Sequence, residues 1–152
     1  MKRTTMQRSV AQTAKPHIIG QTQDAGFQIG ARKTFAVSPQ RAWATLTSPA
    51  GVQLWLGDVV DFQLVPGHVY KARDGAVGEV RVVQPGDHFR MTWQPKLWQK
   101  ASTIQVRVMP SGEKTVISFH QDNLAGPSER KQMYLHWQKV LQELPALLRD
   151  AE

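Results

Sequence analysis

Four short stretches rich in Pro, Gly and Asp divide the middle of the chain into runs that alternate apolar and polar side chains. They are VPGH (65–68), RDGA (73–76), QPGD (84–87) and PSGE (110–113). These residue types favour tight turns, because Pro fixes one backbone angle, Gly adopts positive φ and Asp bonds to nearby backbone amides. The spacing therefore predicts an antiparallel meander of strands.

Alternation within the runs assigns one face of the meander to the core. If QPGD is a four-residue loop, the pairs across the first hairpin are Val80 with Met91 and Val82 with Phe89 inside, and Arg81 with Arg90 outside. In the next hairpin the inner face holds Ser102, Ile104, Val106 and Val108, with Ile117 expected opposite Val106 and Phe119 opposite Ile104. Glu79 falls on the outer face, where we expect a surface charge pair with Arg81.

Helix signals flank the meander. Ser38-Pro39 and Ser48-Pro49 each combine an N-cap residue with proline at the first helical position. They predict a helix from Pro39 to about Thr47 and a second one through Trp55, which Gly57 ends.

The longest element is predicted from about Pro127 to Arg149. Its apolar residues recur every three or four positions, at Met133, Trp137, Val140, Leu141, Leu144 and Leu148. This stripe must lie on the concave face of the sheet, because no other large apolar surface is available. Pro145 lacks the amide that would bond to the carbonyl of Leu141, so we expect the last turn to bend or to end early.

Charge is unevenly distributed along the 152-residue chain. Of the 19 Lys and Arg residues, four lie in the first 20 positions, which contain no acid, so 15 basic and 12 acidic groups remain beyond them. We expect a basic N-terminal tail at 1–25 and a single domain at 26–152. A mobile tail is the simplest interpretation of the first segment, with a transit-like peptide or an anion contact as alternatives. A nucleic-acid role ranks last, because the domain lacks a basic stripe interleaved with exposed aromatics.

Several classes of chemistry have no signature in the sequence. There is no cysteine, and the signatures of serine hydrolases, zinc proteases and nucleotide-binding loops are absent, so we expect no metal and no cofactor. No stretch approaches the roughly 20 apolar residues of a membrane span, and the N-terminus lacks the apolar core of a secretory signal, so a cytoplasmic protein is expected. The histidines do not pair at ligand spacing. His88 and His120 are assigned to the outer face and His68 to a turn, whereas His136 borders the apolar stripe of the long helix.

The order of these elements resembles the helix-grip fold, and four segments resemble one branch of the START-related SRPBCC superfamily, the branch named for the activator of the heat-shock protein 90 ATPase. The segments are SPQRAWATLTSPAGVQLWLGD (38–58), GEVRVVQPGDHFRMTW (78–93), TVISFHQDNL (115–124) and HWQKVLQELPALL (136–148). The resemblance covers about residues 26 to 149. It implies an α+β fold in which a curved antiparallel sheet grips the C-terminal helix, often around an apolar cavity.

Across that superfamily such cavities bind lipids, polyketides, hormones and other hydrophobic small molecules. The co-chaperone role belongs to relatives with an additional N-terminal domain, so a chaperone partner for this chain rests on the family name alone. The oligomeric state is open, with a homodimer as one option.

Bulky and adaptable side chains are concentrated at the predicted sheet and helix interface, which favours a cavity there. The residues expected to bind a ligand are Trp55, Val80, Val82, Phe89, Met91, Trp93, Ile104, Val106, Ile117, Phe119, Gln121, Met133, Trp137 and Leu141. Trp98 lies past Pro95, where it either closes over an opening or packs on its rim. Gln121 places an amide near the mouth of the cavity or makes a strand-end hydrogen bond.

Two functions are consistent with these features. The favoured one is a module that binds an apolar small molecule without altering it, since the inferred interior offers few polar groups. The alternative is an enzyme of the cyclase or hydratase kind, with His136, Gln121 or Tyr70 as candidates. A cavity that contains a titratable side chain with a perturbed pKa would favour the enzyme, and a purely apolar cavity would favour the binding module.

Overall fold

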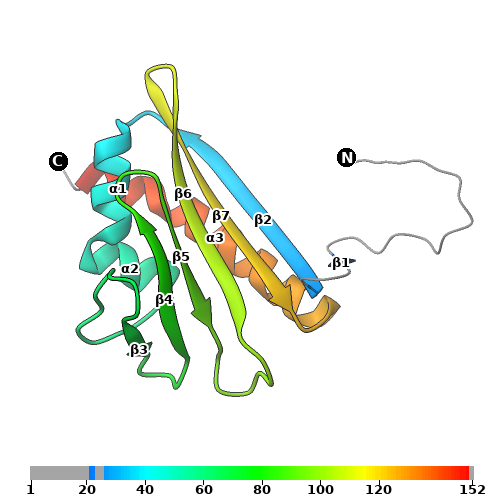
Figure 1. Ribbon diagram of the computed structural model, residues 1–152. Coiled ribbons are helices and arrows are strands. Elements are labelled where there is room, and N and C mark those ends of the chain that lie inside the picture. Colours follow the sequence, from blue (N-terminus) through cyan, green and yellow to red (C-terminus); the bar gives the residue numbers. More distant parts are fainter. Residues whose placement is uncertain (1–20, 23–25, 151–152) are drawn as a thin grey trace, which may run out of the picture.

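The predicted turns connect strands of one antiparallel sheet in the computed structural model, which describes residues 21–22 and 26–150. Seven strands are ordered β1-β2-β7-β6-β5-β4-β3, and every neighbouring pair is antiparallel. The strands are β1 (Gln21–Thr22), β2 (Gly26–Phe35), β3 (Val69–Lys71), β4 (Val77–Gln84), β5 (His88–Trp93), β6 (Ser102–Ser111) and β7 (Lys114–Leu124). Strands β3 to β7 form the predicted meander, and β2 joins it beside β7 (Figure 1).

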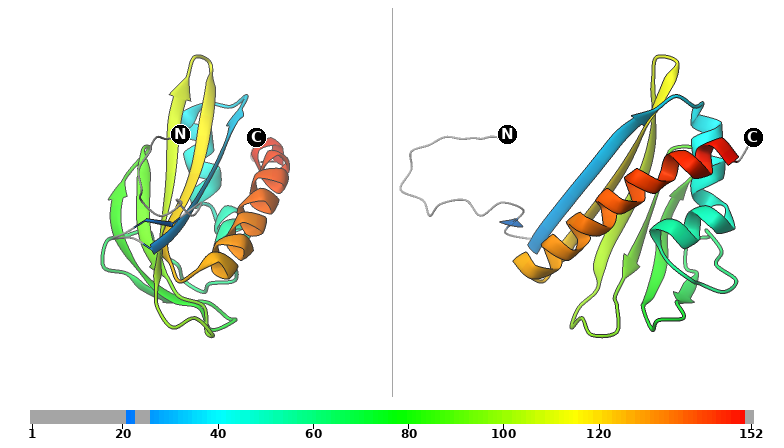
Figure 2. Two further views of the ribbon diagram at one scale, coloured as in Figure 1. Left: turned by 90° about the vertical axis from the view of Figure 1, so that its right-hand side faces the viewer. Right: turned by 180° about the vertical axis from the view of Figure 1, so that it is seen from behind.

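Three helices complete the fold of the described residues: α1 (Pro39–Thr47), α2 (Pro49–Trp55) and α3 (Pro127–Asp150). The short helices carry the chain from β2 to the opposite edge of the sheet. Helix α3 runs obliquely across the concave face, and α1 and α2 lie beside its C-terminal half (Figure 2). The structure confirms the α+β helix-grip architecture.

Both predicted serine caps are present. The Ser38 hydroxyl accepts a hydrogen bond from the Arg41 amide, and the Ser48 hydroxyl accepts one from the Gly51 amide, each at 3.1 Å. These bonds satisfy amides that have no partner within a helix. The chain can therefore end α1 and begin α2 at the same serine.

The register of the β4–β5 hairpin differs from the prediction at Val82. The turn contains three residues, Pro85 to Asp87, because Gln84 pairs with His88, and Val83 therefore stands opposite Phe89. An odd turn length shifts the alternation by one position. A β-bulge between Val80 and Val82 restores it, so Val80 still pairs with Met91, as predicted. The partner of Arg90 is consequently Val82, which lies on the outer face with it, and not Arg81.

The β6–β7 hairpin is also tighter than predicted. Ser111 pairs with Lys114, so the turn consists of two residues, and the expected pairs slip by two positions to Val106 with Phe119 and Val108 with Ile117. A slip of two preserves the face of every side chain. The predicted inner residues of β6 are accordingly all buried.

Helix α3 continues through Pro145 to Asp150, so of the two expected effects of the proline the early end is wrong, and the bend stays a prediction. Two contacts stabilise the last turn. Leu144 and Leu148, on either side of the proline, are buried in the core, and the Arg41 guanidinium donates a hydrogen bond from Nε to the Leu148 carbonyl at 3.0 Å. Packing of an apolar face offsets the one hydrogen bond that proline removes.

Strand β3 is attached to the sheet by a side chain as well as by its backbone. Tyr70 pairs with Gly78 of β4, and its hydroxyl donates a hydrogen bond to the Thr92 carbonyl of β5 at 2.5 Å. A Cβ atom at position 78 would come within 2.3 Å of the tyrosine oxygen and 2.0 Å of the Thr92 carbonyl oxygen. Only glycine leaves room for this crossing.

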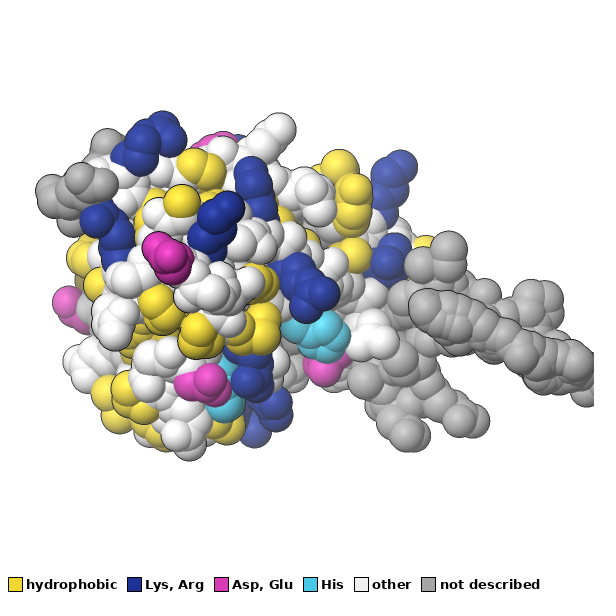
Figure 3. Space-filling model, turned by 90° about the horizontal axis from the view of Figure 1, so that it is seen from above, with side chains coloured by type: hydrophobic (Ala, Val, Ile, Leu, Met, Phe, Trp, Pro, Cys, Tyr) yellow, Lys and Arg dark blue, Asp and Glu magenta, His cyan; other side chains and the backbone are white. Residues whose placement is uncertain are grey.

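At the N-terminus, β1 pairs with the start of β2. Most of the expected tail, residues 1–20 and 23–25, lies outside the described residues. The division of the chain into a tail at 1–25 and a domain at 26–152 therefore stays a prediction. On the face of the molecule seen in Figure 3, basic side chains are spread among apolar and acidic ones.

Candidate functional site

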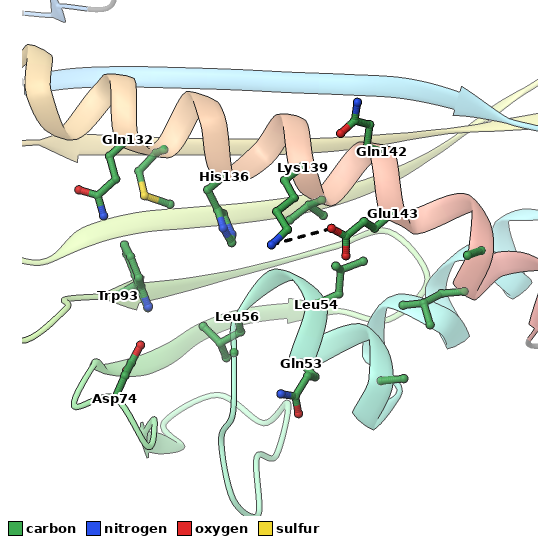
Figure 4. A pocket seen from close by; sticks show the side chains of 16 residues that line it. Gln53, Leu54, Leu56, Asp74, Trp93, Gln132, His136, Lys139, Gln142 and Glu143 are labelled. Carbon is green, nitrogen blue, oxygen red and sulfur yellow. Dashed lines mark ion pairs between the residues drawn. The ribbon is translucent and has the colours of Figure 1, made fainter.

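A groove of about 940 Å³ runs between α2 and α3 and reaches the turn between β3 and β4. Its apolar walls come from both helices and from the segment that follows α2, and include Leu54, Leu56, Met133, Val140 and Leu147. Trp93, from the end of β5, and Asp74, from the β3–β4 turn, bound it at one end (Figure 4). The volume falls within the range of small-molecule sites, which span roughly 300–1,000 Å³.

Helix α3 lines the groove with a second row of side chains, next to its buried stripe. Gln132, His136, Lys139 and Glu143 follow one another at four, three and four residues, which places them on one side of the helix, toward α2. The stripe that contains Trp137 instead faces the sheet. One helix thus supplies the core on one side and a mixed polar and apolar wall on the other.

His136 is the titratable side chain most closely held in the groove. Its Nε2 lies 3.0 Å from the carbonyl oxygen of Trp55, the last residue of α2. A carbonyl only accepts hydrogen bonds, so Nε2 carries a proton. Burial lowers the pKa of His136 from its ordinary value; the bond to Trp55 acts in the opposite direction, and the Lys139 ammonium lowers the pKa further. The imidazole is therefore neutral near pH 7, with its proton on Nε2.

Lys139 and Glu143 form an ion pair along α3, with 3.9 Å between Nζ and Oε2 (Figure 4). Both side chains are largely exposed, so the pair contributes little to stability. Its effect on the groove is to place one cation and one anion beside the apolar wall.

The fourteen predicted ligand-binding residues fall into three groups. Trp93 and Met133 line the groove. Val82 lies on the outer face, in a polar hollow that also contains Arg81 and Arg90. The remaining eleven are buried and pack together in the core: Trp55, Val80, Phe89, Met91, Ile104, Val106, Ile117, Phe119, Gln121, Trp137 and Leu141. Whether any of the fourteen contacts a ligand stays a prediction.

Packing in that interior is aromatic and close. The rings of Phe119 and Trp137 are stacked, with centroids 4.7 Å apart and planes inclined by 14°. Phe89 contacts Trp55 at 5.3 Å and the edge of Trp43 at 5.7 Å. The space between sheet and helix, where the sequence suggested a cavity, is therefore occupied at these positions by aromatic rings.

Gln121 belongs to a buried chain of hydrogen bonds. Its Oε1 accepts from the indole Nε1 of Trp137 at 2.9 Å, and its Nε2 donates to the Ser102 hydroxyl at 2.8 Å. Ser102 in turn donates to the Trp93 carbonyl at 2.9 Å. These bonds engage both ends of the Gln121 amide in the core, with partners on β6 and α3, which differs from the strand-end hydrogen bond that was expected.

The other candidates have local roles. Tyr70 is buried against Phe62 and its hydroxyl is bonded to Thr92; burial raises its pKa. Trp98 and Trp93 pack edge to face, with centroids 5.2 Å apart, and Trp98 itself does not line the groove; its position over an opening or on its rim stays a prediction. Glu79 and Arg81 form the expected surface pair at 3.5 Å.

The other described histidines, His68, His88 and His120, do not line the groove. His120 contacts Gln28 on the outer face, and His88 is bonded to Asp87. His68, which was assigned to a turn, is half-buried beside Phe62, and its Nε2 is buried without a hydrogen-bond partner among the described residues.

Sequence reasoning missed most of the groove. Leu54, Lys139, Glu143 and Leu147 were assigned no role, and His136 was placed only at the border of the apolar stripe and among the candidates of the alternative enzyme. The available signal was the spacing of Gln132, His136, Lys139 and Glu143, which marks a continuous helix side.

Within residues 21–22 and 26–150, no group of three or more His, Cys, Asp or Glu side chains is arranged to hold a metal ion. In the same part of the chain, no helix is long and apolar enough to cross a membrane.

Comparison with known proteins points to one family. Residues 36–149 match the family described as Activator of Hsp90 ATPase homolog 1-like protein. No curated protein matches the sequence significantly.

Solved structures share the fold at low sequence identity. A protein of Mesorhizobium loti is 22% identical with a TM-score of 0.68, over 82% of this chain and 98% of that one. CalU16 of Micromonospora echinospora is 17% identical with a TM-score of 0.72, over 84% and 80%. An HSP90 activator of Plasmodium falciparum is 16% identical with a TM-score of 0.68, over 81% and 96%. At these identities the likeness concerns the fold alone.

Proposed function

Because this chain belongs to the family of Activator of Hsp90 ATPase homolog 1-like proteins, whose helix-grip fold it shares, we propose that it binds a small molecule with an apolar body in the groove between α2 and α3. The observation that carries this proposal is the groove itself, about 940 Å³ with apolar walls from both helices. Burial of apolar ligand surface against such walls provides the main driving force for binding.

The proposed site differs from the cavity suggested by the sequence. Aromatic packing such as that of Trp137 on Phe119 occupies the interior between sheet and α3. The groove is open at the surface, so a ligand enters it without displacing core side chains. Trp93 and Met133 are the predicted ligand contacts that this site retains.

A titration with a neutral apolar fluorophore, N-phenyl-1-naphthylamine, tests the proposal. Leu147→Gln introduces an amide into the groove wall and should weaken binding about tenfold or more. Leu135→Gln is the matched control, because Leu135 lies on the same helix, is 59% exposed and does not line the groove. Absence of binding to the wild type, or equal binding by the two variants, would refute the proposal.

A second candidate, an enzyme of the cyclase or hydratase kind, is favoured by one observation. The groove holds His136, a titratable side chain whose pKa is lowered by burial, so it is not purely apolar. A neutral imidazole with a fixed proton can act as a general base. Deuterium exchange of an acidic C–H in a bound aromatic β-diketone, faster with the wild type than with His136→Gln, would support this function. Equal exchange rates would exclude His136 as the base.

An interaction with a chaperone has no comparable support. It rests on the family description and on the name of the Plasmodium structure. Neither points to a surface of this chain, so the groove remains the basis of the proposal.

A further inference from the structure

The position of His136 restricts the kind of polar group that a groove ligand can carry. Nε2 of His136 donates to the Trp55 carbonyl, which leaves Nδ1 as the lone-pair nitrogen of the neutral ring. Among the residues that the structure describes, none donates a hydrogen bond to Nδ1. Nδ1 is not fully buried either. His136 lines the groove and projects into it (Figure 4). The groove thus offers a hydrogen-bond acceptor whose tautomer is fixed by α2.

The apolar side chains around this acceptor make an unpaired lone pair unfavourable once a ligand excludes water. Met133 and Val140 lie on the same helix as His136, and Leu54 lies opposite on α2. A bound apolar molecule would cover these side chains and remove water from Nδ1. An acceptor desolvated without a donor weakens binding, so a ligand that supplies a donor at this point is favoured.

The charge of that donor follows from the same surroundings. The charged side chains that line the groove with His136 are Lys139 and Glu143 on α3 and Asp74 on the β3–β4 turn, while α2 contributes the Trp55 carbonyl and the uncharged Gln53. Burial and the Lys139 ammonium both disfavour a positive charge on His136. They disfavour a ligand ammonium at the same place. A carboxylate has no proton to donate, and it would add a negative charge to a groove that Glu143 and Asp74 also line.

We infer that the groove ligand is an uncharged hydroxyl compound with an apolar body, a phenol being the simplest case, and that its O–H donates to Nδ1 of His136. The inference rests on the proposed binding function and adds the chemical class of the ligand. The hydroxyl lies at His136, and the apolar body lies along the walls that α2 and α3 supply.

Two naphthalene compounds that differ in one hydrogen-bond donor test the inference. 2-Naphthol can donate to Nδ1, whereas 2-methoxynaphthalene keeps the ring and the oxygen but cannot donate. Equilibrium dialysis with the wild-type protein should give about tenfold tighter binding of 2-naphthol, the effect of one hydrogen bond in a partly desolvated site. 2-Naphthoate and 2-naphthylmethylammonium should bind more weakly than 2-naphthol.

Variants at position 136 separate the acceptor from the rest of the ring. His136→Gln places an amide donor near the Trp55 carbonyl but no acceptor near the position of Nδ1. This variant should therefore bind 2-naphthol and 2-methoxynaphthalene about equally, and its affinity for 2-methoxynaphthalene should equal that of the wild type. His136→Asn places an amide oxygen near the position of Nδ1 and should restore part of the preference. His120→Gln, on the outer face, is the control and should behave as the wild type. Thermal melting of each variant confirms that it is folded.

Acidification provides an independent readout. Protonation of Nδ1 removes the acceptor, so the preference for 2-naphthol should decline as pH falls below the ordinary imidazole range, and His136→Gln should show no such decline. Equal binding of both compounds by the wild type, or an unchanged preference in His136→Gln, would overturn the inference and leave the binding function intact. Failure of both compounds to bind the wild type would refute the binding function and the inference together.

Discussion

Two neighbouring residues of α3, His136 and Trp137, contact different regions of the molecule. Trp137 is fully buried and stacked on Phe119, and its indole nitrogen is bonded to Gln121. His136 is half-buried, packs its ring edge against Trp137 and points into the groove. Successive helical residues point about 100° apart, so one helix can close a core with one side and line a surface site with the next. The buried stripe that contains Trp137 thus packs against the interior, with Met133 and Val140 also reaching the groove, and the mixed row beside it supplies the rest of the groove wall.

Among the variants that test this difference, Trp137→Ala is expected to have the largest effect on stability. The substitution removes a ring from a packed interior and leaves a cavity, so it should lower the free energy of unfolding by about 3–5 kcal/mol. Urea denaturation measures it. A much smaller loss of unfolding free energy would mean that the interior beneath α3 contains a cavity, so that the core would not be packed more tightly than the groove.

The buried hydrogen bonds of Gln121 should be the next most costly to remove. Gln121→Leu keeps a similar volume but leaves the Trp137 indole N–H without its acceptor, so we expect a loss of about 1–3 kcal/mol. Gln105→Leu on the adjacent strand is the control. Gln105 accepts from Arg90 on the outer face, and its replacement should change stability by about 0.5 kcal/mol or less. Similar losses for both variants would contradict the assigned role of the buried network.

Trp93 should behave differently from Trp137. It is half-buried, lines the groove and contacts Trp98 edge-on. Trp93→Ala should lower stability by about 1–2 kcal/mol, because less apolar surface returns to water. Probe binding in the groove should fall by about tenfold or more. If Trp93→Ala costs as much stability as Trp137→Ala and leaves probe binding unchanged, Trp93 belongs to the core and not to the site.

The smallest expected effect is a pH dependence from His136. Burial lowers its pKa in the folded protein, so below about pH 6.5 the unfolded chain binds a proton more readily than the folded one. The contribution of the neutral imidazole to stability is fully present above that pH and is lost as pH falls toward the folded-state pKa. Urea denaturation at pH 7.5 and 5.5 should give a larger decrease for the wild type than for His136→Gln. An equal decrease in both would show that His136 does not carry this dependence.

Much of the fold follows from local patterns in the sequence. The serine and proline pairs locate α1 and α2, and the apolar spacing of α3 predicts the residues that face the sheet, including Trp137. A register error of two residues leaves each side chain on its predicted face of the sheet, as at Ile117 and Phe119. An error of one residue moves it to the other face, as at Val82. Turn length and the bulge depend on backbone geometry that residue types do not specify.

The groove was harder to predict, because it depends on how α2 and α3 pack and not on the spacing within either helix. Leu54 and Leu147 lie far apart in the sequence and meet only at this junction. Apolar periodicity selects the residues that pack most tightly, and these are the residues least available to a ligand. The buried bond of Gln121 to Trp137 likewise joins two elements that the sequence treats separately.

The tyrosine that crosses from β3 to β5 has a consequence for aggregation. Strand β3 forms one edge of the sheet, and an edge strand with unpaired amides can recruit strands from other molecules. Here the edge is only three residues long, and the hydroxyl of Tyr70 ties it across Gly78 to the second strand inward. A side chain at position 78 would displace the ring and loosen this edge. The closure of this sheet edge therefore depends in part on a single hydrogen atom, the one that glycine carries where alanine has a methyl group.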